Sequence, residues 1–479
     1  MRAVILVLAA GCATAGSGSG SKDPRLPGLL SEAIRFPTVA GNDEARRDQQ
    51  AWLLRTAAAL GLNARDAGPV TEVELPGPPG APVLGLVVHG DVQPVDAAQW
   101  TVPPFEGLVR DGFVIGRGAA DDKGPLVQAL LAMQGLRGAT LTHTVRLLVG
   151  SDEESGSSDM KIYLAAHAPP AYSLVLDSEF PVVVGEKAWD GLAVLPASEQ
   201  CAGAFRVEEI DAGLAPSIVP DRARLTLSGD TAALRQRLAA KTPDPGTRLE
   251  LQQRKGLLDI VMQGKSAHAG VNIAGGRNAL VSLARLLQGE LPDCALADLF
   301  AFIAAQDTRG VALGLTGAAP GWGGWAVNVA TLRKEPRLGG KLALVINLRR
   351  PPPMNATQSR DQLYAQVRKF SPRLAPGTIF FGDEPLIFNP QAKLVRRLMD
   401  DYAKATGERP PLAISGGGTY AKRIPNAIAF GMWFPGKPYP GHDVDEKLPV
   451  ADLQRGLEVL ALTLRDLATS APLQEPFQP

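Results

Sequence analysis

Short apolar runs alternate with amphipathic segments along the first part of the chain. Apolar runs at residues 84–88, 145–149 and 174–176 predict short strands, because each spans only a few residues between polar stretches. Residues 44–60 and 125–134 place apolar side chains at helical spacing, which predicts two helices. Such alternation is typical of an α/β fold in which helices flank a mostly parallel sheet.

A different pattern occupies the middle of the chain, from residue 188 to residue 383. Strand-like runs at 224–227, 257–262 and 342–348 are mixed there with fewer helices, such as the one expected at 278–288. This mixture predicts a second domain of α+β type.

The alternation of helix and strand returns in the last part of the chain. A helix is expected at 391–405 and a strand at 427–430, followed by a closing helix with regularly spaced leucines. The chain has 479 residues, whereas domains usually hold roughly 100 to 200. We therefore predict a discontinuous α/β domain made of residues 23–187 and 384–479, with the α+β domain, 188–383, inserted in it.

The N-terminal segment resembles a targeting sequence. Its apolar run, 3–10, is too short to span a bilayer and suits the core of a signal peptide. Gly11-Cys12 resembles a bacterial lipoprotein processing site, and a Gly/Ser-rich stretch at 16–21 suits a flexible tether. We expect residues 1–22 to direct export, giving a lipoprotein on the periplasmic face of a bacterial membrane or a periplasmic or secreted protein. An uncleaved N-terminal strand is the alternative.

Charge and cysteine content limit the classes of partner and metal site. Lys plus Arg and Asp plus Glu number 49 each, which leaves no net field to attract nucleic acid or an anionic membrane surface. We therefore expect small-molecule ligands, no nucleic-acid partner, and membrane contact only through the N-terminal anchor. After the targeting segment only Cys201 and Cys294 remain, too few for a disulfide scaffold or a Cys-ligated zinc site. A metal would have to be held by histidines and carboxylates.

Histidine is scarce, with five in the chain. His89 ends an apolar strand, and open α/β sheets place their sites at the carboxyl ends of strands. Asp91 points to the same side of an extended chain and can hold the second ring nitrogen of a metal-bound histidine. The alternative is a hydrogen-bonded structural histidine.

Carboxylates gather in two further loops. Asp121 lies in a Gly-rich stretch at 116–124 directly before a helix, where a helix N-cap or a phosphate-binding loop is the alternative. Glu153 and Glu154 belong to an acidic turn after the strand at 145–149. Adjacent carboxylates repel one another unless a cation neutralises them, and a solvated acidic turn is the alternative there.

Two more residues complete a possible metal site. Asp177 closes a strand, and His442 lies in a Pro-Gly-His-Asp turn near the C-terminus. Either one alone is more often structural. Together with His89, Asp121 and Glu154 they form a set of histidines and carboxylates, which zinc accepts as ligands. One bridging carboxylate with ligands on each side predicts a co-catalytic metal pair.

These segments together resemble the aminoacylase and carboxypeptidase-G type family of two-zinc exopeptidases, nearest its bacterial dipeptidase branch, which includes carnosine-splitting Xaa-His dipeptidases. The likeness covers nearly the whole chain. It rests on His-Gly-Asp at 89–91, the loops at 116–124 and 151–156, Gly-Lys-Ser-Ala-His at 264–268 and the glycine loop at 416–421. It implies a zinc-exopeptidase catalytic domain, discontinuous in sequence, with an inserted α+β lid domain.

The resemblance also implies a role for each residue. Two zinc ions per chain, replaceable by manganese or cobalt, would be bound by the ligand set His89, Asp121, Glu154, Asp177 and His442. Asp121 would bridge the ions; His89 and Asp177 would complete one site, and Glu154 and His442 the other. Asp91 would steer His89, and Glu153 would act as the general base. A cis peptide between Asp121 and Asp122 is implied as well.

Substrate contacts are implied in the same way. His268 of the lid would stabilise the oxyanion of the tetrahedral intermediate. Arg349 would grip the substrate carboxylate, and Gly416, Gly417 and Gly418 would present backbone amides to it, an ordinary turn being the alternative. The positions that depart from the family pattern are Ser217, Arg350 and Asp443. They concern the lid and the substrate rather than the metal ligands.

The sequence thus predicts a metallopeptidase that hydrolyses the amide bond of dipeptides. The resemblance, through its large lid, favours a monomer. An N-acyl-amino-acid deacylase of the same family would use the same water and metals. An acid that pairs with a free substrate ammonium would distinguish the two, and the sequence does not identify one. A non-catalytic binding protein on this fold is the alternative from another class, against which the presence of Glu153 and every expected ligand counts.

Overall fold

The computed structural model describes residues 22–203 and 205–477. The expected signal peptide and Cys12 fall outside these residues, so export and lipidation stay predictions. Within the described ranges, no helix combines the length and the apolar character that a membrane crossing requires.

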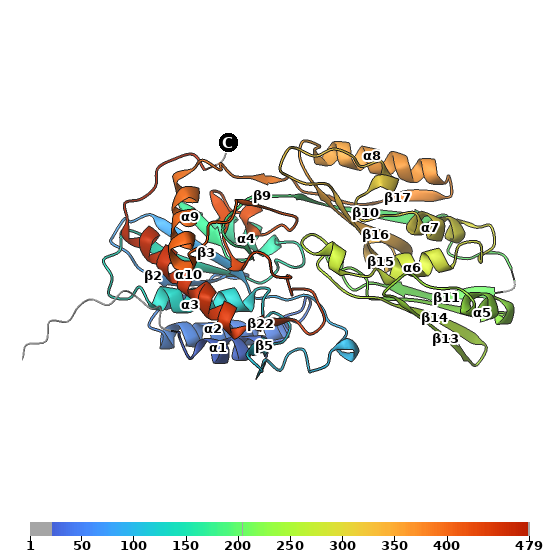
Figure 1. Cartoon of the computed structure of the whole chain (residues 1–479), viewed down its shortest axis with the longest axis horizontal. Helices are drawn as coiled ribbons and strands as arrows, with labels where there is room; N and C mark the ends of the chain where they lie inside the picture. The colour runs from blue at the N-terminus through green and yellow to red at the C-terminus, as the bar shows by residue number, and fades with distance from the viewer. Residues whose placement is uncertain (1–21, 204, 478–479) are drawn as a thin grey trace, which may run out of the picture.

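A mixed, largely parallel sheet forms the first domain (Figure 1). Its strands run in the order β1-β2-β6-β3-β7-β20-β9-β18, with β19 paired to β9. Their bounds are β1 Asn63–Asp66, β2 Thr71–Leu75, β3 Val83–His89, β6 Thr144–Gly150, β7 Tyr172–Val175, β9 Val183–Glu186, β18 Leu386–Ile387, β19 Ala413–Ser415 and β20 Ala427–Ala429. The neighbours β6, β3, β7 and β20 are parallel, so their carboxyl ends meet at one edge.

Strand β20 joins two distant parts of the sequence in this sheet. Its residue Ala427 lies opposite Ser173 of β7 in the parallel register. The segments before and after the insertion therefore build one domain, as the returning helix and strand pattern predicts.

Helices cover both faces of the sheet. They are α1 Leu26–Ile34, α2 Asp43–Ala59, α3 Lys123–Gln134, α4 Ser158–Ala166, α9 Lys393–Thr406 and α10 Val450–Thr469. Leu86 and Val88 of β3 belong to the apolar core that contains α3 and α10, whereas the intervening Val87 packs in a smaller core with α4. Because successive strand residues face opposite sides, a strand covered on both faces is apolar throughout.

An antiparallel sheet forms the inserted domain, which lies beside the first (Figure 1). Its strand order is β13-β14-β12-β11-β15-β16-β10-β17. The bounds are β10 Ala188–Pro196, β11 Phe205–Ala212, β12 Arg222–Gly229, β13 Arg248–Arg254, β14 Leu257–Gln263, β15 Ala326–Glu335, β16 Lys341–Arg350 and β17 Leu374–Gly382. The helices are α5 Ala232–Ala239, α6 Ala279–Leu286, α7 Ala295–Ala304 and α8 Ala356–Phe370. A separate apolar core lies within it, which confirms the α+β insertion.

Small sheets complete the first domain. One has the order β22-β5-β4, with β4 Leu108–Arg110, β5 Phe113–Ile115 and β22 Lys447–Pro449. The other pairs β8, Ser178–Glu179, with β21, Met432–Trp433, in parallel. This second pair directly follows Asp177 and lies close to the candidate site.

The chain crosses between the domains at Lys187. Strand β9 ends at Glu186 and β10 begins at Ala188, so a nearly continuous extended segment links the two sheets (Figure 1). Lys422 Nζ donates a hydrogen bond to the Lys187 carbonyl and lies 3.4 Å from Asp383, near the return crossing. The exact boundaries expected at 188 and 383 stay predictions.

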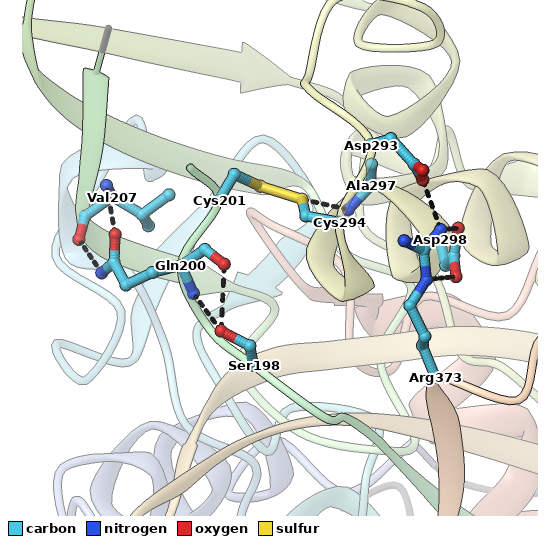
Figure 2. The surroundings of a disulfide bond; sticks show 9 residues. All are labelled: Ser198, Gln200, Cys201, Val207, Asp293, Cys294, Ala297, Asp298 and Arg373. Carbon is cyan, nitrogen blue, oxygen red and sulfur yellow. Dashed lines mark hydrogen bonds and ion pairs between the residues drawn. A yellow bond between two sulfur atoms is a disulfide. The ribbon is translucent and has the colours of Figure 1, made fainter. Parts of the chain in front are cut away.

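A disulfide bond joins Cys201 to Cys294 within the inserted domain (Figure 2). The two cysteines are 93 residues apart in sequence. Cys294 is the N-cap of α7, and its sulfur accepts a hydrogen bond from the Ala297 amide. The bond therefore fixes the start of α7 to the loop after β10, a pairing that the cysteine count alone did not indicate.

Candidate metal centre and active site

His89 is the last residue of β3 and is fully buried. Its Nδ1 lies 2.9 Å from the carbonyl oxygen of Asp91, which can only accept, so Nδ1 carries the ring proton. Nε2 then presents its lone pair to Asp121 Oδ1 at 2.9 Å, with Asp177 Oδ2 at 3.8 Å. Because His89 Nε2 and Asp121 Oδ1 are both acceptors, a separation of 2.9 Å requires a proton or a metal cation between them.

Asp91 also binds the acidic turn, a contact that the sequence analysis did not predict. Its carboxylate lies 3.5 Å from His89 Nδ1 and accepts the backbone N–H groups of Glu153, at 3.1 Å, and Glu154, at 3.0 Å. Asp91 therefore holds His89 mainly through its carbonyl oxygen and the acidic turn through its carboxylate.

Asp121 lies between the two expected ligand histidines. Its Oδ1 faces His89 Nε2 at 2.9 Å, and its Oδ2 faces His442 Nε2 at 3.1 Å. The Tyr439 hydroxyl donates to the same Oδ2 at 2.6 Å. The peptide between Asp121 and Asp122 is cis, as the resemblance implies. The two oxygens of Asp121 therefore face the two histidines, and bridging of two metal ions stays a prediction.

Glu154 completes the far side of the cluster. Its Oε1 lies 3.2 Å from His442 Nε2, and its Oε2 accepts a hydrogen bond of 2.7 Å from Gln93. The Gln93 amide also donates to Ser217 Oγ of the lid at 2.9 Å. Ser217, which departs from the family pattern, therefore still contributes a contact between the lid and the catalytic domain.

The donor set fits divalent metal ions. His89, Asp121 and Glu154 offer ligand atoms within 4.8 Å of one another, and so do His89, Glu153 and Asp177. Histidine nitrogen and carboxylate oxygen are ligands that zinc accepts. The second group shows that Glu153, expected as the base, also lies within reach of a metal position.

The electrostatics of the cluster match that donor set. Burial and the nearby carboxylates raise the pKa of Asp177 well above its usual value, and burial with Glu154 does the same for Glu153 against the opposing effect of His89. Burial opposes a charge on His442, but Glu154 and Asp121 outweigh it and raise its pKa to about 10. The surplus of buried acid is the environment in which a cation is stabilised.

His268 reaches this cluster from the lid, as expected. Its ring centre lies 4.4 Å from that of His442 and 5.8 Å from that of Tyr439. The amides of Gly270 and Val271 donate to its Nδ1 at 3.0 and 2.9 Å. Nδ1 is thus an acceptor, and the ring proton of the neutral form is on Nε2. Burial, with His442 and Arg349 nearby, lowers the pKa of His268 well below its usual value, which favours that neutral form.

Arg349 and Arg350 have different surroundings. Arg350 is fully buried, with its Nε 2.8 Å from Asp190, and is a structural cation of the lid. Arg349 is also buried but donates to the amide oxygen of Asn347 at 3.2 Å, and among the described residues no carboxylate lies within ion-pair distance of it. Burial lowers the pKa of Arg349 to about 10, with Glu153 acting in the opposite direction. Arg350 is thus paired within the lid, whereas binding of the substrate carboxylate by Arg349 stays a prediction.

The glycine loop lies against the lid near these residues. A Cβ atom added to Gly270 would come within 2.4 Å of the Gly416 carbonyl oxygen and 3.1 Å of Arg349 Cζ, and one added to Gly417 would lie 3.9 Å from His268 Cε1. The Gly417 amide already donates to Ser415 Oγ at 2.9 Å. Gly416 and Gly417 therefore lie close to Arg349 and His268, although the Gly417 amide is engaged, whereas Gly418 adjoins Lys422.

Some residues of the site had no signal in the sequence analysis. Tyr439 and Gln93 contact Asp121 and Glu154, yet neither residue type stands out in its segment. Glu446, which belongs with His442 to the segments that carry the resemblance, accepts the amides of Ala120 at 2.8 Å and Asp121 at 3.2 Å and so holds the loop that carries Asp121. The last of the departing positions, Asp443, is half-buried, and burial raises its pKa to about 6.

Comparisons with known proteins identify the family of the chain. The model of the family described as peptidase family M20/M25/M40 matches residues 85–466. A putative dipeptidase, YtjP, of Bacillus subtilis is 30% identical over 404 residues, covering 81% of this chain and 84% of the relative. A Beta-Ala-Xaa dipeptidase of Lactobacillus delbrueckii subsp. lactis is 26% identical, covering 81% and 83%.

Solved structures show the same fold at lower identity. Human carnosine dipeptidase 1 matches with a TM-score of 0.58 and 16% identity, covering 92% of this chain and 95% of that one. The di-peptidase Dug1p from Saccharomyces cerevisiae matches with a TM-score of 0.59 and 15% identity at the same coverage, 92% and 95%.

Proposed function

The chain belongs to the peptidase family M20/M25/M40, and on that premise we propose that it is a two-zinc dipeptidase. The observation that carries the proposal is Asp121, whose two oxygens face His89 at 2.9 Å and His442 at 3.1 Å. The dipeptidase names of the two relatives support the choice of substrate class.

Two metal positions share Asp121 in this proposal. His89 and Asp177 would complete one, and Glu154 and His442 the other. When bound, the metal pair would polarise the scissile carbonyl as a Lewis acid and lower the pKa of water at the site. Zinc is proposed because the donors are nitrogen and oxygen, and manganese or cobalt could replace it.

Glu153 is proposed as the general base. Its backbone N–H is fixed by Asp91 at 3.1 Å, so its position relative to His89 is set by a buried contact. The carboxylate would accept a proton from the attacking water and return it to the nitrogen of the departing amine.

His268 is proposed as the donor to the carbonyl oxygen of the substrate. Because its Nδ1 accepts the amides of Gly270 and Val271, the neutral ring can donate only through Nε2. A donor held in place before the reaction stabilises the negative charge that develops on that oxygen in the transition state.

Arg349 is proposed to bind the carboxylate of the C-terminal residue of the dipeptide. It is a buried guanidinium next to Gly270 and close to the loop at 416–418. A planar guanidinium can donate two parallel hydrogen bonds to a carboxylate. These contacts would place the scissile bond between His268 and the metal positions.

A hydrolysis panel tests the function. The purified chain, with added zinc, is expected to release amino acids from free dipeptides and to act weakly on N-acylated dipeptides and on N-acyl amino acids. Faster release from N-acyl amino acids would replace the dipeptidase by the deacylase reading. Absence of hydrolysis across the panel, with two zinc ions bound, would reject both enzymatic proposals.

Export is proposed as well, on two supports. The N-terminal sequence resembles a lipoprotein signal, and a disulfide joins Cys201 to Cys294. Disulfides persist in oxidising compartments and are rare in the cytosol. Replacement of Cys12 by Ser is expected to release the protein from membranes, and continued membrane attachment of the variant would count against lipidation.

A further inference from the structure

The acidic turn, residues 151–154, is held through four consecutive backbone amides. The last two donate to Asp91. The first two, of Ser151 and Asp152, donate to Asp159 Oδ2 at 2.6 and 3.1 Å. Asp159 lies on α4 and is 1% exposed. Its side chain is therefore the second buried carboxylate on which the position of this turn depends.

A third donor reaches Asp159 Oδ2 from a distant part of the chain. The Tyr420 hydroxyl donates to that oxygen at 2.5 Å across a separation of 261 residues, and Tyr420 is also 1% exposed. The same hydroxyl lies close to the start of the turn, since a Cβ atom added to Gly150 would come within 2.0 Å of it. Tyr420 therefore touches both the carboxylate that holds the acidic turn and the residue that leads into it.

Tyr420 lies near the end of the glycine loop, 416–421, and the start of this loop adjoins the proposed site for the substrate carboxylate. A Cβ atom added to Gly270 would lie 2.4 Å from the Gly416 carbonyl oxygen and 3.1 Å from Arg349 Cζ, so these two groups are neighbours. The loop therefore connects the surroundings of Arg349 to the hydrogen bonds that hold the acidic turn.

The segment of the loop next to Tyr420 is anchored in the catalytic domain. The Thr419 amide and hydroxyl donate to the fully buried Glu186 at 3.0 and 2.7 Å. The Thr419 hydroxyl also accepts the Ala421 amide at 3.1 Å and caps the short helix η5, Tyr420–Lys422. Coupling between two parts of a site is carried by contiguous hydrogen bonds and packed side chains of this kind.

We propose that Tyr420, acting through Asp159, is a positioning residue that transmits binding of the substrate carboxylate at the glycine loop to the acidic turn that carries Glu153. The inference rests on the proposed dipeptidase function and gives the carboxylate a use beyond binding. Contacts with a part of the substrate that does not react raise kcat when they orient groups at the reacting centre. A dipeptide with a free carboxylate would therefore react faster once bound.

The test combines one mutation with one change of substrate. Alanyl-alanine and alanyl-alaninamide differ only in the C-terminal carboxylate, and cleavage of the bond between their two residues is measured with the zinc-loaded chain. Tyr420→Phe, which removes only the hydroxyl, should lower kcat for alanyl-alanine by about 10-fold with little change in KM. It should change kcat for alanyl-alaninamide by less than about twofold, because no carboxylate is bound there to be coupled.

Tyr163→Phe is the matched control. The Tyr163 hydroxyl donates to Glu72 at 2.6 Å, and Tyr163 belongs to the same small apolar core as Tyr420, so this change removes a similar buried hydrogen bond to a carboxylate outside the site. It should leave kcat and KM for both substrates unchanged. Zinc per chain should be the same in the wild-type chain and in both variants, because neither tyrosine is a proposed ligand.

Hydrogen exchange gives a second readout that does not depend on turnover. Saturating alanine, which carries the carboxylate of the product, should slow exchange at the amides of Ser151 and Asp152 in the zinc-loaded wild-type chain, because both amides donate to Asp159. Tyr420→Phe should lose most of this effect, whereas Tyr163→Phe should retain it. An equal effect of alanine in all three chains would contradict transmission through Tyr420.

Four kinetic outcomes would overturn the inference. A parallel fall in kcat on both substrates in Tyr420→Phe would make Tyr420 a support of the fold alone. A change confined to KM would limit the loop to binding. Equal wild-type kcat on the two substrates, or unchanged kinetics in Tyr420→Phe, would show that binding of the carboxylate is not transmitted. Failure of the wild-type chain to hydrolyse alanyl-alanine would instead reject the dipeptidase function itself.

Discussion

Each step of the proposed chemistry depends on a single side chain, and proton transfer depends on Glu153. We expect Glu153→Ala to retain its fold and close to two zinc ions per chain while kcat falls by about 10³-fold or more, because no other group is proposed to move the proton. Activity assays with metal analysis check this. Asp152→Asn is the control, since Asp152 lies in the same turn but accepts a hydrogen bond from the Ser158 amide.

Loss of one zinc ion from Glu153→Ala would contradict the base assignment. Glu153 offers an oxygen within 4.8 Å of ligand atoms of His89 and Asp177, and such a loss would make it a ligand instead.

His268 gives a prediction of a different kind, because it is not a proposed metal ligand. His268→Ala should lower kcat by about 10²- to 10³-fold with a smaller effect on KM, because the lost hydrogen bond forms with charge that develops in the transition state. Zinc content should not change. An unaltered kcat would show that the lid does not donate to the substrate.

At the scale of elements, the packing of α9 against α10 contains a buried acid. Asp401 of α9 is buried, and its Oδ2 has no hydrogen-bond partner among the described residues. Burial and Asp466 of α10 raise its pKa to about 7, against the opposing effects of Arg397 and Lys404. The folded chain therefore holds a proton that the unfolded chain releases near pH 4.

This shift makes stability fall as pH rises from about 4 to about 7, since the folded state binds more protons across that window. We expect Asp401→Asn to raise the free energy of unfolding at pH 8 by about 1 to 2 kcal/mol and to change it little at pH 4. Urea unfolding at both values checks this. Asp400→Asn, at an exposed neighbour, should keep the wild-type pH profile.

Elements with a strong local pattern were the ones that the sequence could predict. Helix α6 begins one residue after the expected start, where Asn278 caps it, and β3, β6, β12, β14 and β16 lie within three residues of the expected bounds. Strand β17 and helix α7 were not predicted. Strand β17 contains Pro376 and Gly377, which interrupt a strand pattern, and the segment of α7 carries apolar residues at almost every position.

The same reasoning explains which parts of the site were foreseen. His89, Glu153 and Asp177 follow β3, β6 and β7, which are parallel neighbours, so local sequence and sheet topology together predict that these three residues meet. Tyr439 lies 318 residues from Asp121 along the chain, and Gln93 contacts Ser217 across 124 residues. No local pattern encodes contacts at such separations.

At the scale of the whole molecule, the effect of the lid disulfide on the free energy of unfolding can be measured directly. It closes a loop across 93 residues that contains β11 to α6. We expect reduction to lower the free energy of unfolding by about 2 to 4 kcal/mol, because the open chain gains conformational freedom when unfolded. Urea unfolding with and without reductant checks this. A chain with both Cys201→Ser and Cys294→Ser should be insensitive to reductant.

The position of His268 beside His442 has a consequence for how the enzyme behaves on dilution. The lid that carries His268 and the sheet that carries the ligands belong to one polypeptide, joined at Lys187 and near Asp383. A single chain therefore supplies every residue of the proposed centre, and the centre can form without a second chain. Turnover per chain should be the same at nanomolar and at micromolar enzyme concentration.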